Sequence, residues 1–458
     1  MHDPYRNRLI LFSNTFPYGT GETFLAEEIP HLAKEFTEIV IYPLYEELGT
    51  VREVPSNARL CRALLPFNHK DKLGFLTKGI FNTAPFFFAF KEFFSRALCG
   101  RDIKLERGKK KAGLFKRLRI FFNYFLMLRT MLGERKQMER ILSECAFADK
   151  IYFYWGDKSA MMIPFLKKRL APMVETLPKF CVRFHGSDLY EGAKGYLPFR
   201  NEIFAETDFA ITVSNNGASY IKKNYNPAPK LIETWHLGSA HHSRECTNLS
   251  KESSHSNIFN IVSCSNVIEL KRVNLILSAL KLLVKDGDAL DVLKDAGYDS
   301  LSWTHFGGGV LFESLKKEVN EFLLSLSQGS DFNVNIELKG VTPHKEVLEF
   351  YQNRGADLFI LVSRSEGVPV SIMEAFSYGI PVIATNVGGV SELFRNCPLG
   401  YLVDSSITAQ GLEAQIVEFI KLPAEIKKQM RENAFENWAE NWDAKKNYSA
   451  FAQELAAL

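Results

Sequence analysis

Residues 363–389 decide the fold: Ser363-Arg-Ser-Glu-Gly-Val-Pro-Val-Ser-Ile-Met-Glu-Ala-Phe-Ser-Tyr-Gly-Ile-Pro-Val-Ile-Ala-Thr-Asn-Val-Gly-Gly389. The residues just before this stretch, 356–362, are typical of a strand buried on both faces. Pro369 suits the first turn of a helix, where its missing N–H costs little, and Gly379 ends that helix. Residues 381–385 then predict a second buried strand. The stretch therefore predicts strand, tight loop, helix and strand, which is the repeating unit of a doubly wound sheet.

Short apolar strands alternate with helix-like segments along nearly the whole chain. Many of these strands are rich in β-branched or aromatic residues without strict alternation, as expected for parallel strands covered on both faces. The predicted strands are 9–13, 38–44, 150–155, 179–185, 209–214, 258–264, 301–306, 334–339, 356–362 and 381–385. We therefore predict an α/β protein with two doubly wound, Rossmann-like domains that face a cleft.

A polar stretch separates the two sets of strands. Residues 239–257 contain His-His, Ser-Arg-Glu and Ser-Ser-His-Ser with almost nothing apolar, which is typical of a linker. We predict an N-terminal domain over 1–240, a linker over 241–257 and a second domain over 258–425. The helical tail at 426–458 either caps the second domain or packs back on the first.

The composition is that of an ordinary folded protein. The chain has 458 residues, of which 46% are hydrophobic and 24% charged, enough for two or three domains. A net charge of only +3 argues against a nucleic-acid binder. The seven cysteines are scattered without a Cys-x-x-Cys pair, which is typical of reduced thiols. We see no signal peptide and no membrane-spanning segment, so we expect a cytoplasmic protein.

Residues 70–136 are both basic and aromatic. They hold 17 Lys and Arg against 5 Asp and Glu, and 12 of the 37 phenylalanines. Lys116, Arg119 and Asn123 follow helical spacing opposite a broad apolar face, a pattern typical of helices that bind an anionic membrane surface. The alternative is that the aromatic residues only pack against the first domain while the charges are solvated. The first alternative predicts peripheral attachment to the inner face of the cytoplasmic membrane.

Two carboxylates lie beside the predicted helix start at 369–372. Glu366 lies in the loop and Glu374 lies one turn into the helix. Open α/β sheets bind ligands at the carboxyl ends of their strands, where helix amides favour phosphate. Carboxylates suit hydroxyl groups instead, so we predict a sugar or a ribose next to a phosphate. The alternative is a capped surface helix whose carboxylates only aid solubility.

The sequence Glu366-x7-Glu374, followed by Gly-Ile-Pro-Val-Ile-Ala-Thr at 379–385, resembles the retaining glycosyltransferases of family 4, the glycosyl transferases group 1. These enzymes have the GT-B fold of two Rossmann-like domains. The resemblance implies that Glu366 contacts the donor sugar and Glu374 the ribose hydroxyls. It also implies that Gly367 and Val368 lie against the donor, a UDP- or GDP-sugar, and that no metal cofactor is required.

Residues 262–273 are a second element that matches the family. They predict a strand, a loop and a helix that begins near Val273. In the family a Lys at the position of Lys271 binds the donor diphosphate, and an Arg usually lies five residues earlier, where this sequence has Asn266. Either Arg272 or Arg364 could supply that missing positive charge. A solvated Lys is the plain alternative, but a cation at a helix start opposes the helix dipole, which favours a functional reason.

Glycine-containing turns add donor contacts by resemblance. The loop with Gly19, Gly21 and Glu22 follows the first strand, and glycine lets a backbone approach a ligand closely. It resembles a family loop that closes over donor and acceptor, which implies donor binding by the two glycines and an acceptor-side Glu22. Likewise, residues 339–341 resemble the segment near the base, which implies a donor contact at Gly340.

The turn Arg183-Phe-His185-Gly-Ser-Asp188 ends another predicted strand. Taken alone, His185 is better explained as a satisfied structural residue than as a functional one. The turn resembles the acceptor-side motif of the family, which implies that His185 lies near the reacting sugar and that Asp188 orients it or contacts the acceptor. Asp286-Gly-Asp288 is an Asp-x-Asp pattern that turn chemistry explains without a metal.

Together these features predict a retaining glycosyltransferase of hexosyltransferase type. The predicted acceptor is a lipid-linked or growing saccharide in the synthesis of a capsular, exo- or lipopolysaccharide. Retention combined with the lack of a convincing nucleophile favours front-face substitution. The alternatives are a nucleotide-sugar epimerase with the same fold, and a non-catalytic subunit that binds a sugar nucleotide.

Overall fold

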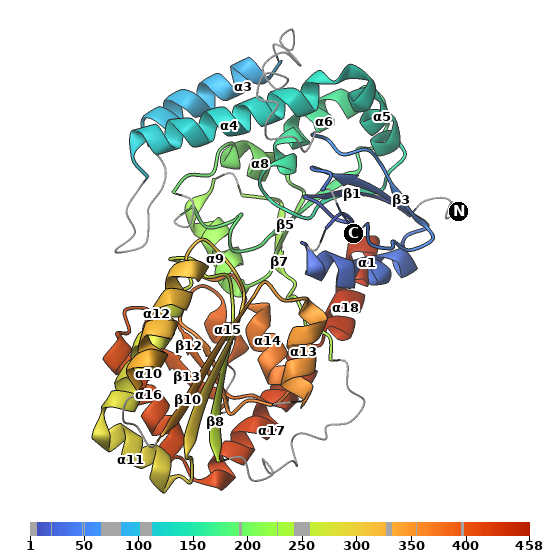
Figure 1. The fold of residues 1–458 in the computed structure, drawn as a ribbon. Helices are drawn as coiled ribbons and strands as arrows, with labels where there is room; N and C mark the ends of the chain where they lie inside the picture. Colours follow the sequence, from blue (N-terminus) through green and yellow to red (C-terminus); the bar gives the residue numbers. More distant parts are fainter. Residues whose placement is uncertain are drawn as a thin grey trace. The chain divides into compact units, whose positions relative to one another are not determined.

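The computed structural model describes residues 7–19, 21–47, 49, 51–65, 84–100, 112–191, 195–226, 228–241, 257–326, 332–353, 355–394 and 398–458. The chain divides into two compact units, with 1–237 and 444–458 in unit 1 and 238–443 in unit 2. Each unit is an α/β domain around one parallel sheet, which confirms the predicted fold class (Figure 1). The predicted linker at 241–257 lies almost wholly outside the described residues.

Unit 1 contains a seven-stranded parallel sheet in the order β3-β2-β1-β4-β5-β6-β7. Successive side chains of a strand point to opposite faces, so Ile10 and Phe12 of β1 pack on one side and Leu9 and Leu11 on the other. The strands are β1 (Arg8–Ser13), β2 (Glu38–Pro43), β3 (Ala58–Leu60), β4 (Lys150–Phe153), β5 (Lys179–Phe184), β6 (Phe209–Thr212) and β7 (Leu231–Thr234).

Helices cover both faces of this sheet. On one face lie α1 (Thr23–Glu35) and α18 (Ala444–Ala457), which pack against each other. The other helices of the unit are α3 (Ala84–Glu92), the π-helix η1 (Phe93–Leu98), α4 (Leu114–Gly133), α5 (Arg135–Ala146), the 3₁₀-helix η2 (Ser159–Met162), α6 (Ile163–Leu170), α8 (Arg200–Glu206) and α9 (Asn215–Asn224). Helices α4, α5 and α6 contribute side chains to the core on the second face.

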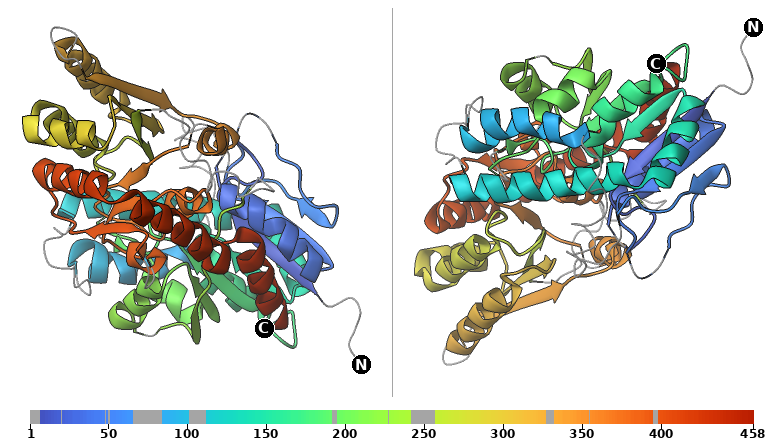
Figure 2. Two further views of the ribbon diagram at one scale, coloured as in Figure 1. Left: turned by 90° about the horizontal axis from the view of Figure 1, so that it is seen from below. Right: turned by 90° about the horizontal axis from the view of Figure 1, so that it is seen from above.

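Unit 2 contains a six-stranded parallel sheet in the order β10-β9-β8-β11-β12-β13. Its strands are β8 (Ile258–Cys264), β9 (Ser300–Phe306), β10 (Asn333–Gly340), β11 (Leu358–Leu361), β12 (Val382–Thr385) and β13 (Gly400–Val403). Its helices are α10 (Val273–Lys285), α11 (Gly287–Asp295), α12 (Phe312–Leu326), α13 (His344–Asn353), α14 (Val370–Ser377), α15 (Val390–Leu393), α16 (Ala409–Lys421) and α17 (Ala424–Asn441). Figure 2 shows these elements from two further directions.

Three strands of the structure are absent from the sequence prediction, and all three form sheet edges. They are β3 and β7 in unit 1 and β13 in unit 2. Each is only three or four residues long and mostly half-buried or exposed. An edge strand has a neighbour on one side only, so it lacks the continuous buried apolar run by which the central strands are recognised.

The segment predicted as one tail over 426–458 contains two helices with different partners. Helix α17 packs on α14 in unit 2, and α18 packs on α1 in unit 1. Phe451 of α18 is fully buried, and its ring lies 4.2 Å from the Arg183 guanidinium. Arg183 in turn forms a buried ion pair with Glu28 of α1 at 2.6 Å. Burial, opposed by the charge of Arg183, raises the pKa of Glu28.

Only part of the basic, aromatic segment 70–136 is described. Residues 70–83 and 101–111, including the run Lys109–Lys111, lie outside the described residues. The remainder forms α3, η1, α4 and the start of α5. Within the described ranges, no helix combines the length and apolar character needed to cross a membrane.

We predict that Phe451→Ala destabilises unit 1 by about 3–5 kcal/mol, because it removes a large buried ring and leaves a cavity above Arg183. Gln453→Ala, at an exposed position of the same helix, is the matched control and should change little. Urea unfolding followed by circular dichroism measures both. Equal effects of the two substitutions would contradict the packing role of α18.

Candidate functional site

The direction of the chain reverses in the middle of the unit 2 sheet. From β8 the chain proceeds to β9 and β10 on one side, and it later enters β11 and β12 on the other. The loops that follow β8 and β11 therefore lie next to each other at the carboxyl edge. In open α/β sheets this position is where ligands bind. Lys271 lies in the first loop and Glu366 in the second.

The structure brings Lys271 and Glu366 together. Lys271 Nζ lies 2.6 Å from Glu366 Oε1 and donates a hydrogen bond to it, although 95 positions separate them in the chain. The Glu366 side chain is 8% exposed and that of Lys271 is 21% exposed. A carboxylate so deeply buried requires a cationic partner. The two residues that the sequence singled out in separate motifs thus form one charged centre.

Two arginines lie beside this pair. Arg272 Nε donates to the Val362 carbonyl at 2.6 Å, and its Nη2 is buried without a hydrogen-bond partner in the described part of the chain. Arg364 is more exposed, and its Nη1 lies 3.5 Å from Glu269 Oε1. The Arg364 amide donates to the Leu270 carbonyl at 2.8 Å, so the loops that carry the two arginines lie against each other. Burial first and the charge of Arg364 second lower the pKa of Arg272. Both arginines therefore add positive charge to the two loops that carry Lys271 and Glu366.

Glu374 lies on α14, with its carboxylate almost buried. His344 Nε2, at the start of α13, lies 2.7 Å from Glu374 Oε1. His344 was not predicted from the sequence, although its place shortly after the segment 339–341 is a signal for it. Pro369 is the N-cap residue, and α14 begins one residue later, at Val370. Glu366 and Glu374 therefore have different partners in this structure.

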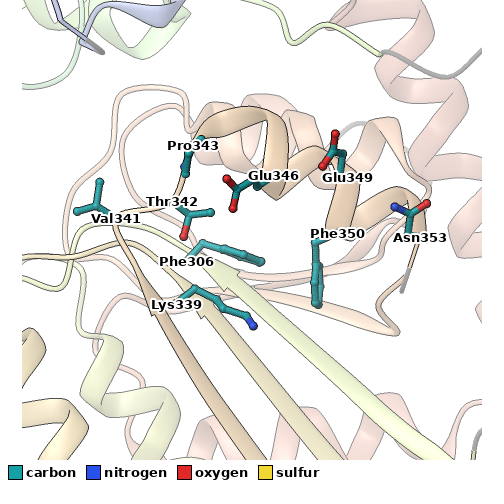
Figure 3. A pocket seen from close by; sticks show the side chains of 9 residues that line it. All are labelled: Phe306, Lys339, Val341, Thr342, Pro343, Glu346, Glu349, Phe350 and Asn353. Carbon is teal, nitrogen blue, oxygen red and sulfur yellow. The ribbon is translucent and has the colours of Figure 1, made fainter. Parts of the chain in front are cut away.

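A hollow of about 390 Å³ lies at the carboxyl ends of β9 and β10, beneath α13. It is lined by Phe306, Lys339, Val341, Thr342, Pro343, Glu346, Glu349, Phe350 and Asn353. Figure 3 shows the Glu346 and Phe350 side chains reaching from α13 toward Phe306 and Lys339. The rings of Phe306 and Phe350 meet edge to face, with their centroids 5.1 Å apart. Gly340 immediately precedes the loop that forms one wall.

The loop after β12 holds the Glu366 turn in place. Gly389 N donates to the Gly367 carbonyl at 2.7 Å, and the adjacent Val368 is buried. Gly388 has a φ of +58°, and a Cβ at this position would lie 1.9 Å from the Glu366 carbonyl oxygen. Only glycine allows this contact. The sequence quoted at the outset ends on these two glycines, but nothing in it reveals what they touch.

The unit 1 sheet has a similar reversal between β1 and β4. Glu22 lies in the loop after β1, and its carboxylate accepts hydrogen bonds from the backbone amides of Asn14, Thr15 and Phe16. It also accepts one from Trp155 Nε1 at 2.6 Å. The carboxylate is thus taken up in shaping the loop that carries Gly19 and Gly21. This geometry favours a positioning role for Glu22 over the acceptor contact implied by resemblance.

His185 lies in the loop after β5, next to these groups. Its ring centroid is 4.3 Å from that of Trp155, which follows β4. Both imidazole nitrogens are buried without a hydrogen bond among the described residues, and Nδ1 lies 3.8 Å from Asp188 Oδ2. Asp188 accepts from the His185 amide at 2.7 Å and from the Gly156 amide at 2.8 Å. Asp188 therefore fixes the backbone that carries the imidazole.

The charge of Asp188 is stabilised by these contacts. Burial alone favours the neutral acid, but the adjacent His185 side chain first and the charge of Arg200 second hold the pKa of Asp188 below its ordinary value. Trp155 was missed because the sequence pattern placed it inside a strand. Its position directly after β4, at the carboxyl edge, is the signal that could have found it.

Asp286 has the local role expected from turn chemistry, because its side chain accepts from the amides of Asp288 and Ala289 and caps α11. Within the described ranges no cluster of three His, Cys, Asp or Glu side chains is suited to hold a metal ion.

Comparisons with known proteins agree with this architecture. Residues 248–437 match the family model described as glycosyl transferases group 1. A putative colanic acid biosynthesis glycosyltransferase of Salmonella typhimurium is 26% identical over 293 residues, which cover 61% of this chain and 64% of that protein. The amylovoran biosynthesis glycosyltransferase AmsK of Erwinia amylovora is 24% identical, over 53% of this chain and 55% of that protein. The chain thus spans somewhat less than two thirds of the length of these relatives.

Solved structures share the fold of this chain over nearly its whole length. HepE of Anabaena, in complex with UDP and glucose, matches 99% of this chain and 100% of its own with a TM-score of 0.60 and 12% identity. Sucrose-phosphate synthase of Thermosynechococcus elongatus gives the same coverage and identity with a TM-score of 0.61. The fold is therefore GT-B. Residues 248–437, which make up most of unit 2, are similar in sequence to the group 1 glycosyltransferases.

We predict that Gly388→Ala destabilises unit 2 by at least about 2 kcal/mol more than Gly355→Ala. Both positions have positive φ, +58° and +69°, so the backbone strain is matched, but a Cβ at Gly355 meets nothing within 4 Å. Thermal unfolding of the two variants makes the comparison. Equal losses would show that Gly388 does not serve to hold the Glu366 turn.

Proposed function

We propose that this protein transfers a hexose from a nucleotide-diphosphate sugar to a saccharide acceptor, with retention at the anomeric carbon. The observation that carries this proposal is the Lys271–Glu366 pair, flanked by Arg272 and Arg364, at the switch point of unit 2. Glycosyl transfer breaks an anomeric C–O bond and leaves negative charge on the diphosphate. Fixed cations at that place stabilise the charge as it develops.

The groups around the pair support a consistent placement of the donor. Lys271 and Arg272 face the diphosphate, and Glu366, with Gly367 and Val368, contacts the sugar. Glu374, held by His344, accepts from the ribose hydroxyls. The hollow beside Gly340 takes the base, because its paired rings offer an apolar wall and its loop offers backbone groups. Because side chains supply the positive charge, we expect activity without an added metal ion.

In unit 1, Gly19 and Gly21 line the donor side, and His185 contacts the reacting sugar or the acceptor. Its unpartnered ring nitrogens leave it free to donate or accept a hydrogen bond there. Glu22 and Asp188 hold the two loops in shape.

The acceptor class rests on the relatives, which are named for colanic acid, amylovoran and O-antigen biosynthesis. We therefore infer a lipid-linked or growing saccharide of a cell-envelope polysaccharide. UDP is the first nucleotide to test, because HepE has been solved with it; GDP is the second.

The experiment is a thermal-shift screen against UDP, GDP and their hexoses, followed by proton NMR of the product formed from the stabilising donor. Binding to the folded state raises the melting temperature in proportion to RT ln(1 + [L]/Kd). A product with the donor's anomeric configuration is expected. An inverted linkage would refute retention, donor turnover to an epimer without acceptor would favour the epimerase, and binding without any turnover would favour a non-catalytic subunit.

We predict that Lys271→Ala lowers kcat by about 10²–10³, because it removes the cation facing the leaving diphosphate. Lys285→Ala, an exposed Lys at the other end of α10, is the matched control and should retain full activity. Initial rates at saturating donor measure the effect. A Lys271→Ala variant that retains kcat within threefold would remove Lys271 from the mechanism.

A further inference from the structure

The surface of α3, η1 and α4 in unit 1 carries a group of exposed phenylalanines, which we call the aromatic face. Six of the seven exposed phenylalanines in the described part of the chain belong to it: Phe86, Phe87, Phe90, Phe94, Phe115 and Phe122. Phe87 and Phe115 are 88% and 87% exposed. Single exposed apolar residues are common on protein surfaces, but a gathered set marks an interaction site.

The aromatic face is continuous across the two helices. Phe90 and Phe94 have ring centroids 4.6 Å apart, Phe94 and Phe93 5.2 Å, and Phe93 and Phe122 6.0 Å. Figures 1 and 2 show α3 and α4 lying side by side along most of their length. These ring contacts join η1 to α4, so the exposed rings of the two helices form one surface.

A rigid layer lies beneath the aromatic face. The rings of Phe88 and Phe199 are stacked with their centroids 5.1 Å apart. Phe121 of α4 is buried, and its ring centroid lies 5.3 Å from that of Phe93. Arg96 forms an ion pair with Glu191 in which both side chains are almost completely buried. The helices are therefore firmly attached to unit 1 on their inner side. The sequence left two interpretations of this segment, packing against unit 1 and binding to a membrane. They do not exclude each other, because one set of aromatic residues packs inward while another is exposed.

The charge around the aromatic face has one sign. Lys91, Lys116, Arg117, Arg119 and Arg129 lie on the same helices and are exposed or half-buried. Within 84–100 and 112–133, Glu92 is the one acidic residue, and it is buried against Tyr196 and Arg96. A surface with large rings and a purely cationic rim is complementary to the interface of an anionic bilayer.

We propose that the aromatic face docks unit 1 on an anionic lipid bilayer, with the exposed rings in the headgroup boundary and the cations on lipid phosphates. A second copy of this chain fits less well, because two such faces would oppose cation to cation. This docking does not depend on the proposed function. Only its purpose, which is to bring the enzyme to a lipid-linked acceptor, rests on that function.

The test is co-sedimentation of the full chain with vesicles of phosphatidylcholine, with and without one quarter phosphatidylglycerol. We expect binding to the anionic vesicles that weakens with salt. The double substitution Phe87→Ser, Phe115→Ser should lower the partition coefficient at least about tenfold, because it removes two rings from the interface. Lys116→Ser and Arg119→Ser should each lower it about fivefold.

Phe147→Ser is the matched control, since Phe147 is 74% exposed but lies outside the aromatic face. All variants change exposed side chains, so unchanged melting temperatures will show that they fold. Failure of the wild type to bind anionic vesicles, equal binding to neutral vesicles, or an equal loss in Phe147→Ser would overturn the proposal. So would a dimer in solution that the double substitution dissociates. Donor turnover with a water-soluble acceptor reports on the proposed function separately.

Discussion

The pairing of β8 with β11 is the constraint on which the site in unit 2 depends. Ile261 lies opposite Leu358 and Val262 opposite Phe359, in parallel register. This register places the loops after both strands at one edge, and so brings Lys271 to Glu366. A shift of one residue would turn the buried side chains of β11 to the opposite face, so the hydrophobic core fixes the charged centre as firmly as the ion pair does.

In unit 1, too, the order of the parallel strands brings loops together at one edge of the sheet, but the side chains gathered there are different. There the edge between β1, β4 and β5 gathers Glu22, Trp155 and His185. Two carboxylates, Glu22 and Asp188, accept hydrogen bonds from backbone amides of these loops, and Glu22 also accepts one from Trp155. The imidazole makes no hydrogen bond within the described chain. The two carboxylates thus hold the loops in shape, and the His185 ring is the group left to contact a ligand.

The sequence was sufficient for the central architecture and the local motifs. Strands such as β8 and β12 are short apolar runs bounded by loops, and Glu366, Lys271 and His185 each lie in the loop that follows such a run. It was insufficient wherever a role depends on a distant partner. The role of His344 follows only from its contact with Glu374. That of Gly388 follows only from the close approach of the Glu366 carbonyl oxygen. The edge strands β3, β7 and β13 escaped because their burial, unlike that of β11, is incomplete.

The place of α18 has a consequence for how the chain folds as it is made. The 206 residues of unit 2, 238–443, separate α18 from the rest of unit 1 in the sequence. At 5–20 residues per second, roughly 10–40 s pass between the synthesis of β7 and that of Phe451. During this interval the apolar side of α1, with Leu25, Ile29 and Leu32, has no cover from α18. We therefore expect the nascent chain to expose a transient hydrophobic surface on α1 until α18 emerges.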